Sequence, residues 1–251
     1  MQSERQMRLS LLPMKDIIHC IDAGNTAIKL GVFENGVLIE NHRFEDRESL
    51  FSSLSKDAVI ALASVRDTSF THKLAEQFNV SVLDNTLRTP FQNHYQSAGL
   101  GMDRLCNVAG MYAQLSSEQN NGLSIDIGTC IKFDLLDGKR GYLGGSISPG
   151  VRMQLKALNE HTANLPLLEF PKESPSLYGN TTELSMLSGV IGNLKGEIAW
   201  RIAQYEHEFP NLNIYVSGGD ASYFDLAQKN NIFADENLTL KGIHEIYKFN
   251  A

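Results

Sequence analysis

Short apolar runs separated by glycine-rich turns dominate the first part of the chain. Residues 17–21 form an apolar run that predicts a buried strand, and this run ends at the turn Asp22-Ala-Gly-Asn-Thr. Apolar and polar positions alternate over 27–33, which predicts a return strand. The Asn-Gly pair at 35–36 is typical of a second tight hairpin turn. The pattern therefore predicts two hairpins in succession.

The same pattern restarts in the second half of the chain. An apolar strand is predicted over 123–127, a turn follows at Gly128-Thr-Cys, and a return strand is predicted over 131–136. The Asp-Gly pair at 137–138 signals another hairpin. Both starts read Ile-Asp-x-Gly-(Asn)-Thr-x-Ile-Lys, with one extra residue, Asn25, in the first. A repeat at this distance indicates a duplicated domain rather than a short-period solenoid.

The rest of the pattern completes two α/β lobes. Further strands are expected at 59–64, 80–83 and 213–217, and helices at 68–78, 104–115, 151–158 and 184–205. The polar, turn-rich segment 116–122 predicts the boundary, with an N-terminal lobe over 15–118 and a C-terminal lobe over 119–251. Residues 1–14 are expected to be an N-terminal extension and are a candidate for disorder. The glycines at 189, 192 and 196 predict a close-packed face on the last helix.

Composition narrows the class of protein and of partner. Of the 251 residues, 42% are hydrophobic and 20% are charged, and the formal net charge is −7. An acidic chain lacks the basic stripe that binding to nucleic acid requires, so no nucleic-acid partner is expected. No apolar run approaches the length of a membrane span. The three cysteines include no C-x-x-C pair, which favours a reducing compartment. We therefore expect a cytoplasmic protein without a membrane partner.

The two Asp-x-Gly turns carry groups that suit a polyphosphate. Asp22 and Asp126 can each hold a hydrated cation, while the turn N–H groups and the hydroxyls of Thr26 and Thr129 can face phosphate oxygens. One such turn alone is explained as well by an ordinary hairpin. Two copies with the same flanking residues favour a shared role in phosphate binding. No G-x-x-x-x-G-K-[ST] sequence is present, which argues against a Walker-type phosphate loop.

The tetrad Gly101-Met-Asp-Arg combines an acid with an arginine just before a predicted helix. A carboxylate such as Asp103 can act as a general base toward a hydroxyl, and Arg104 can hold a substrate carboxylate through two hydrogen bonds. Aspartate also caps helices routinely, and for the tetrad taken alone that is the better explanation. The glycine pair 218–219 after the last predicted strand allows either close approach of a ligand or a plain turn.

Taken together, the motifs resemble those of the type III pantothenate kinases. The matching pieces occur in one order, as Asp22-x-Gly-Asn-Thr, Gly101-x-Asp-Arg, Asp126-x-Gly-Thr, Tyr142-Leu-Gly-Gly-x-Ile-Ser-Pro-Gly, Gly179-Asn-Thr-Thr and Ser217-Gly-Gly. The resemblance implies the fold of the superfamily that contains acetate kinase, sugar kinases and actin. That fold is a duplicated actin-like (ribonuclease H-like) α/β structure with two lobes and an ATP cleft between them. It also implies ATP-dependent phosphorylation of pantothenate to 4′-phosphopantothenate, the first step of coenzyme A biosynthesis.

The resemblance also implies roles for individual residues. Asp103 matches the general base, and Asp126 matches the ligand of a monovalent cation, K⁺ or NH₄⁺, which acts beside the Mg²⁺ that accompanies ATP. The ATP-binding positions match Asp22, Ala23, Gly24, Asn25, Thr26, Ala27, Ile28, Lys29 and Thr129. The pantothenate-binding positions match Tyr95, Gly101, Met102, Asp103, Arg104 and Thr182. Members of the family are homodimers with substrate near the subunit interface, so a homodimer is expected.

Two departures and two rival functions remain open. Lys29 stands where many members have an uncharged residue, and Cys130 stands where alanine is common, both beside phosphate contacts. A non-catalytic regulatory relative and a phosphatase of the same superfamily are the alternatives, but the intact Asp103 and both hairpins favour the kinase. Carboxylates that converge on a triphosphate repel it unless cations intervene. The kinase hypothesis therefore requires cations, and it makes Arg104 the expected partner of pantothenate's carboxylate.

Overall fold

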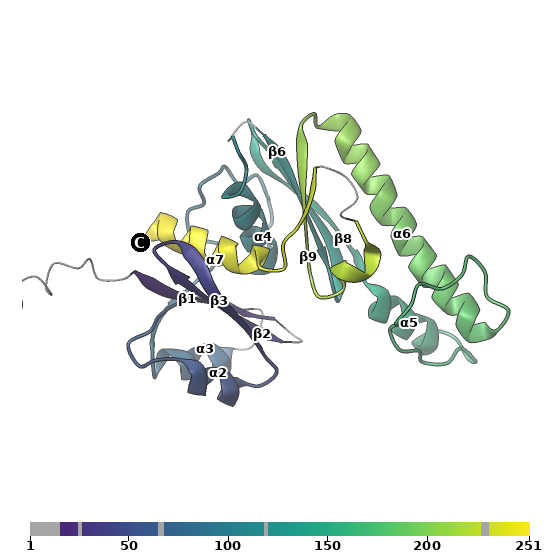
Figure 1. Cartoon of the computed structure of the whole chain (residues 1–251), viewed down its shortest axis with the longest axis horizontal. Coiled ribbons are helices and arrows are strands. Elements are labelled where there is room, and N and C mark those ends of the chain that lie inside the picture. The colour runs from purple at the N-terminus through teal and green to yellow at the C-terminus, as the bar shows by residue number, and fades with distance from the viewer. Residues whose placement is uncertain (1–15, 25–26, 65–67, 118–119, 227–230) are drawn as a thin grey trace, which may run out of the picture. The chain divides into compact units, whose positions relative to one another are not determined.

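The computed structural model describes residues 16–24, 27–64, 68–117, 120–226 and 231–251. The predicted extension 1–14 and two predicted ATP-binding residues, Asn25 and Thr26, lie outside these ranges. The chain groups into two compact units, residues 1–84 and 85–251, and each contains one five-stranded mixed sheet (Figure 1).

The first unit holds the sheet with strand order β3-β2-β1-β4-β5. Its elements are β1 (Ile17–Ala23), β2 (Ile28–Glu34), β3 (Val37–Phe44), α2 (Arg47–Ser53), β4 (Val59–Ser64), α3 (Thr68–Ala75) and β5 (Asn79–Val82). Strand β1 pairs antiparallel with β2 and parallel with β4. Apolar side chains of the sheet form one buried cluster with Leu50 of α2 and with Phe70 and Leu74 of α3. The predicted pair of opening hairpins is confirmed.

The second unit repeats this topology. Its elements are α4 (Met102–Tyr112), β6 (Asn121–Ile127), β7 (Cys130–Asp137), β8 (Gly141–Pro149), α5 (Val151–Glu160), α6 (Thr182–Glu208), β9 (Leu212–Ser217), the short 3₁₀ helix η1 (Ala221–Phe224), β10 (Ile232–Ala234) and α7 (Leu238–Asn250). The strand order β8-β7-β6-β9-β10 matches that of the first sheet, and β6 again pairs antiparallel with β7 and parallel with β9. The predicted duplicated α/β fold is therefore confirmed.

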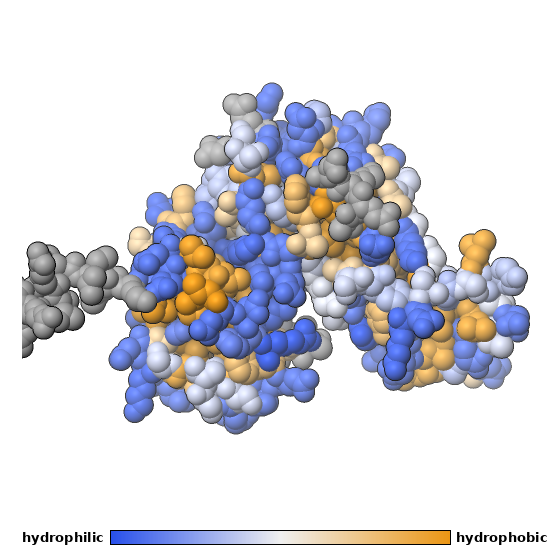
Figure 2. Space-filling view, in the orientation of Figure 1, coloured by the Kyte–Doolittle hydropathy of each residue, from blue (hydrophilic) through white to orange (hydrophobic). Residues whose placement is uncertain are grey.

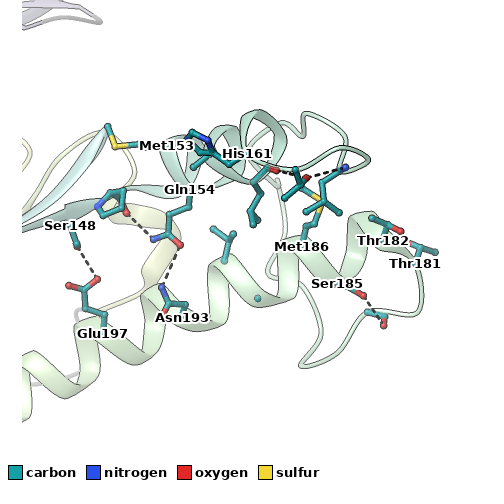
Figure 3. A pocket seen from close by; sticks show the side chains of 18 of the residues that line it. Ser148, Met153, Gln154, His161, Thr181, Thr182, Ser185, Met186, Asn193 and Glu197 are labelled. Carbon is teal, nitrogen blue, oxygen red and sulfur yellow. Dashed lines mark hydrogen bonds between the residues drawn. The ribbon is translucent and has the colours of Figure 1, made fainter.

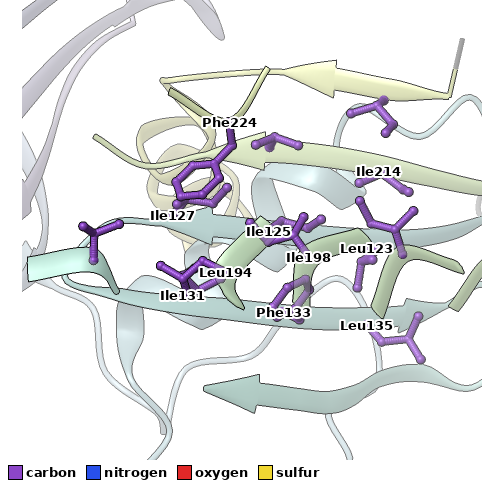
Figure 4. Packing of buried hydrophobic residues seen from close by; sticks show 14 of the residues in the cluster. Leu123, Ile125, Ile127, Ile131, Phe133, Leu135, Leu194, Ile198, Ile214 and Phe224 are labelled. Atoms are coloured by element: carbon purple, nitrogen blue, oxygen red, sulfur yellow. The ribbon is translucent and has the colours of Figure 1, made fainter. Parts of the chain in front are cut away.

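The core of the second unit lies between its sheet and the long helix α6. Leu194 and Ile198 of α6 point at Ile131 and Phe133 of β7, and Phe224 closes the same cluster (Figure 4). All of these side chains are buried. Burial of large apolar side chains is the main favourable contribution to folding, so this layer fixes the strands on which the polar residues of the sheet are placed.

Helices α4 and α7 pack together at glycines, away from the face of the sheet that α6 covers. A Cβ added to Gly110 would lie 2.1 Å from the carbonyl oxygen of Leu238, and one added to Gly242 would meet the backbone of Cys106. The backbones of the two helices therefore approach more closely than any side chain allows. The predicted close-packed face on α6 is wrong for the described residues, because added Cβ atoms at Gly189, Gly192 and Gly196 would meet open space.

Element order and packing divide the chain at different places. By element order, α4 completes the first repeat, in keeping with the predicted lobe 15–118. By packing, α4 contacts α7, β6 and β7, and belongs to the unit 85–251. The lobes predicted from the sequence, 15–118 and 119–251, describe the repeat. They stay a prediction, because the compact units are divided between residues 84 and 85.

Several elements escaped the sequence pattern. Helices α2 and α7 and the short strand β10 were not predicted, and neither was strand β8, which the glycine-rich segment 141–149 forms. Gly145 explains that strand, because a Cβ there would overlap the backbone of Phe133 on β7. The glycines thus permit close strand pairing instead of ending it.

Replacing Gly110 with alanine is expected to destabilise the second unit, because the added methyl group forces α4 and α7 apart. Overpacking of this kind costs about 1–3 kcal/mol. The matched control is Gly196→Ala on the exposed side of α6, which should instead stabilise by about 0.5–1 kcal/mol because glycine is a poor helix former. Chemical denaturation of both variants measures the two changes, and equal stabilities would contradict the described packing.

Candidate active site

A partly buried ammonium group, that of Lys132, links two of the predicted site carboxylates. Lys132 Nζ lies 2.7 Å from Asp103 Oδ2 and 2.7 Å from Asp126 Oδ2, and donates a hydrogen bond to each. Only 18% of the Lys132 side chain is exposed, against 28% for Asp103. The structure therefore brings the predicted general base and the predicted cation ligand into contact with one positive charge.

The strand register explains why Lys132 meets Asp126. The two residues are direct partners across the antiparallel pair β6–β7. Side chains of directly opposed residues project from the same face of a sheet, so an acid and a lysine at these positions form a cross-strand ion pair. Asp103 reaches the same ammonium from the first turn of α4, where a carboxylate is also favoured by the helix dipole.

Lys132 stays charged in this environment. Burial by itself would lower the pKa of its ammonium, but the negative charges of Asp126 and Asp103 outweigh burial and raise the pKa above its ordinary value of 10.5. The stabilisation that the pair gives to the folded state is therefore complete below pH 10.5 and is lost only at more alkaline pH. The positive charge is a permanent part of the site near neutral pH.

Gly101 leaves room for the carboxylate of Asp103. Its backbone is extended, at φ −65° and ψ 133°, which any residue can adopt. However, a Cβ at this position would lie 2.5 Å from Asp103 Oδ1. The same oxygen accepts a hydrogen bond of 2.9 Å from the backbone N–H of Arg104. Glycine is thus required here because a side chain would collide with Asp103. Without that collision, Oδ1 can accept the hydrogen bond from the first turn of α4.

Arg104 forms a buried ion pair with a residue that the sequence did not single out. Its guanidinium donates to Asp134 Oδ1 from Nε at 3.0 Å and from Nη2 at 2.6 Å, and the residue is only 4% exposed. Tyr142 donates a third hydrogen bond of 2.7 Å to the same oxygen. Burial alone would lower the pKa of Arg104, but Asp134 outweighs it and raises that pKa. A guanidinium held in this way is fixed in one orientation.

Tyr95 covers the outer side of Arg104. Its hydroxyl oxygen accepts a hydrogen bond of 3.3 Å from Arg104 Nη1, and the guanidinium carbon lies 5.3 Å from the centre of its ring. The Tyr95 ring in turn stacks parallel to that of Tyr142, with centroids 6.1 Å apart. Two predicted pantothenate-binding residues, Tyr95 and Arg104, therefore lie side by side.

Acid and base alternate where α4 meets β7. Asp103 and Arg104 are consecutive on α4, and they pair with Lys132 and Asp134, which lie two positions apart on one face of β7. Each charge of the helix faces the opposite charge of the strand. This double pair ties the first turn of α4 to the sheet.

The second hairpin presents Thr129 at its tip. Thr129 is exposed, and its carbonyl oxygen accepts a hydrogen bond of 3.0 Å from the N–H of Gly150. A Cβ on Gly150 would lie 2.1 Å from the carbonyl oxygen of Gly128. The segment that leads into α5 therefore packs against the backbone of the turn. Thr129 itself remains exposed.

The first hairpin places its predicted ATP-binding residues in different environments. The side chains of Ala23 and Ile28 are fully buried in the core, so only their backbone groups are available to a ligand. Asp22 and Lys29 are half-buried and are direct partners across β1 and β2, as Asp126 and Lys132 are in the second sheet. Gly24 and Ala27 are also half-buried. The roles of Asn25 and Thr26 concern residues outside the described ranges.

Thr182 lies in a groove apart from the other predicted substrate residues. The groove, with a volume of about 1550 Å³, runs between α5 and the first half of α6 and is lined by residues including Met153, Met186 and Val190 (Figure 3). None of the other predicted site residues lines it. Hydrophobic residues gather on the surface in this part of the molecule (Figure 2). Leu167 is 65% exposed and Leu177 is 95% exposed.

Sequence reasoning missed three residues that organise the site. Lys132 had a signal, because it occupies the same place in the second repeat as Lys29 does in the first. Asp134 and Tyr142 carried a weaker signal, since a single acid on an apolar strand and a tyrosine in a glycine-rich motif have many explanations. Their partnership with Arg104 depends on the pairing of β7 with β8 and on the position of α4.

Replacing Asp134 with asparagine is expected to destabilise the second unit by about 3–5 kcal/mol, because it leaves the buried guanidinium of Arg104 without a counter-charge. Thermal and chemical unfolding measure the loss. The control is Arg140→Gln, which breaks the exposed pair between Arg140 and Asp137. This variant should unfold as the parent does, since solvent screens an exposed pair. A stable Asp134→Asn variant would contradict the role given to this ion pair.

Comparison with known proteins agrees with this arrangement. The family model of type III pantothenate kinase matches residues 18–204. A type III pantothenate kinase of Christiangramia forsetii is 38% identical over 240 residues, covering 92% of this chain and 97% of that protein. Another from Phocaeicola vulgatus is 36% identical over 238 residues, with coverage of 92% and 97%.

Solved structures show likeness of fold. A Campylobacter jejuni protein described as a Baf family transcriptional activator has a TM-score of 0.63 and 21% identity, covering 93% of this chain and 98% of that chain. A Listeria monocytogenes protein described as an N-acetylmannosamine kinase has a TM-score of 0.52 and 12% identity, covering 94% and 100%. At such identities the likeness concerns the two-lobed α/β fold alone. The family match and the curated relatives go further, and they show that the chain belongs to the type III pantothenate kinase family.

Proposed function

We propose that this kinase transfers the γ-phosphoryl group of ATP to the terminal hydroxyl of pantothenate, with Asp103 as the general base. The product would be 4′-phosphopantothenate, formed in the first step of coenzyme A biosynthesis. The family match over residues 18–204 supports the reaction. The position of Asp103, in the first turn of α4 with its carboxylate part-exposed and held by a lysine, is the observation that supports its role.

The geometry of Asp103 suits a base toward an alcohol. Asp103 Oδ2 accepts from Lys132 and Oδ1 accepts from the backbone N–H of Arg104, which fixes the plane of the carboxylate. Each carboxylate oxygen has two acceptor positions, so both oxygens keep a free position for a substrate hydroxyl. In phosphoryl transfer the protein mainly positions the nucleophile and offsets charge. A carboxylate held in one orientation can position the attacking hydroxyl.

The remaining predicted contacts follow the two hairpins. The backbone around Gly24 and the hydroxyl of Thr129 would face phosphate oxygens, each hairpin on its own unit. Within the described residues no group of three or more His, Cys, Asp or Glu side chains could hold a metal. Mg²⁺ would arrive on the ATP phosphates, and an ion bound in this way needs only one or two carboxylates. Asp22 would be one such ligand, and the bound ion would offset the charge of the phosphates.

Arg104 and Tyr95 would bind pantothenate. Asp134 uses Nε and Nη2 of the guanidinium, and Nη1 points to the hydroxyl of Tyr95. A substrate carboxylate would reach Arg104 by displacing the Tyr95 hydroxyl from Nη1, while Asp134 keeps the guanidinium oriented. Met102 is buried and its neighbour Gly101 is half-buried, so these two would contribute mainly backbone contacts.

Thr182 and the expected homodimer belong together. Thr182 is exposed and lines a groove that contains no other predicted substrate residue. This separation supports a contact between Thr182 and the substrate of a second copy of the chain. The exposed apolar side chains around the groove support an interface there as well. Among the helices of the described residues, none combines the length and the hydropathy of a membrane span. The cysteine pattern supports a cytoplasmic location.

Lys132 competes with the monovalent cation that is predicted at Asp126. Asp126 Oδ2 already accepts a hydrogen bond of 2.7 Å from Lys132 Nζ. An ion at that oxygen would lie beside a positive charge.

The Asp103→Asn variant is expected to bind ATP as the parent does but to lose about 10²–10⁴-fold in kcat, because an amide cannot accept the hydroxyl proton. A coupled assay of ADP release with pantothenate measures turnover, and calorimetric titration with ATP measures binding. Near-normal kcat would remove Asp103 as the base. The parent enzyme provides the wider test, since ADP release that does not depend on pantothenate would refute the proposed reaction.

Gly101→Ala is expected to lower kcat by about tenfold or more with little loss of stability, because the new methyl group displaces the side chain of Asp103 rather than the backbone. The matched control is Gly99→Ala, where the added Cβ would lie 3.5 Å from Ser97 Oγ, an ordinary contact. Its kcat and melting temperature should equal those of the parent. If both alanine variants keep full activity, the spatial role given to Gly101 is wrong.

A further inference from the structure

Lys132 has the chemistry of the cation that the site would otherwise need. Its head group is an alkylated ammonium, which carries the same single charge as K⁺ or NH₄⁺. Its nitrogen lies 2.7 Å from an oxygen of Asp126, the residue matched to the cation ligand, and 2.7 Å from an oxygen of Asp103. A distance of this size is that of a charge-assisted hydrogen bond.

The fit of a separate monovalent ion at Asp126 is poor while Lys132 is present. The Lys132 side chain is 18% exposed, and its ammonium donates a hydrogen bond to both carboxylates. Two unit charges placed about 4 Å apart repel by several kcal/mol in a partly buried site.

The positive charge of Lys132 offsets negative charge in the site. Asp103 and Asp126 place two negative charges next to each other, and a triphosphate would add more. One fixed positive charge between the carboxylates offsets this repulsion without an ion that must be taken up from solution. A tethered group also loses less freedom on binding than a free ion, because the strand pair β6–β7 already holds it in position.

We propose that Lys132 is a built-in monovalent cation, so that this enzyme turns over without added K⁺ or NH₄⁺. The inference rests on the proposed function, since its readout is pantothenate phosphorylation. The ammonium keeps Asp126 paired and holds Oδ2 of Asp103 in place, which makes Lys132 a positioning residue for the general base. The prediction of an external monovalent cation at Asp126 is thereby replaced by a residue of the chain.

The first test measures the parent enzyme in chloride salts of K⁺, NH₄⁺, Na⁺ and choline at equal ionic strength, with Mg²⁺ constant and the coupling enzymes checked in each salt. Initial rates should agree within about twofold, because the cation of the site is covalently attached. Rates that rise about tenfold or more in K⁺ or NH₄⁺ relative to choline would overturn the proposal. Absence of pantothenate-dependent ADP release in every salt would instead refute the proposed function.

The second test removes the ammonium by Lys132→Thr, which leaves space and a hydroxyl oxygen beside Asp126, and threonine suits a strand. In choline, kcat should fall by about 10²-fold, a loss typical of removing one group that stabilises charge in a site. K⁺ or NH₄⁺ should restore about tenfold or more of it. The matched control, Lys156→Thr, removes an exposed lysine of α5 that pairs with Glu160, and its rates should not respond to the salt.

Thermal unfolding provides a readout that does not depend on turnover. The melting temperature of Lys132→Thr should rise when choline is exchanged for K⁺ or NH₄⁺, because an ion then binds the folded site only. The parent and Lys156→Thr should melt at the same temperature in both salts. A Lys132→Thr variant that folds but gains neither activity nor stability from either ion would assign Lys132 to a different role and overturn the proposal.

Discussion

The register between β6 and β7 is the constraint on which the site depends. It sets Asp126 directly opposite Lys132, and it sets Asp134 two residues further along on the same face. A shift by one residue would turn these side chains to the opposite face, into the layer packed by α6. Because Ile131 and Phe133 are anchored under Leu194 and Ile198, the apolar core excludes that shift. The polar site is thus held in place by the burial of its apolar neighbours.

The two sheets show how one topology supports two kinds of hairpin. Both place an acid at the end of the first strand and a lysine opposite it on the second, as Asp22 with Lys29 and Asp126 with Lys132. In the second unit, α4 adds a further acid, Asp103, and the lysine becomes shared. Duplication therefore supplies the acid–lysine pair, and packing of α4 in the second unit converts it into part of a candidate catalytic site.

Local patterns predicted the parts of the structure that depend on nearby residues. The strands around both Asp-x-Gly turns and the helix α6 follow from periodicity and turn chemistry. The order of the motifs indicated the family. The partnership of Arg104 with Asp134 could not be predicted, because it joins residues thirty positions apart through the placement of α4 on β7. Likewise, glycines within α6 indicated close packing, whereas the close approach occurs at Gly110 and Gly242. Sequence spacing does not reveal which helix face finds a partner.

The alternating charges between α4 and β7 have a consequence for how the helix docks. In the native position, Asp103 meets Lys132 and Arg104 meets Asp134. A helix displaced so that Asp103 faced Asp134 and Arg104 faced Lys132 would place like charges together at both contacts, and such contacts repel strongly where water is scarce. The four charges therefore favour one alignment of α4 on β7. Charge repulsion disfavours the displaced alignment, in which the site could not form.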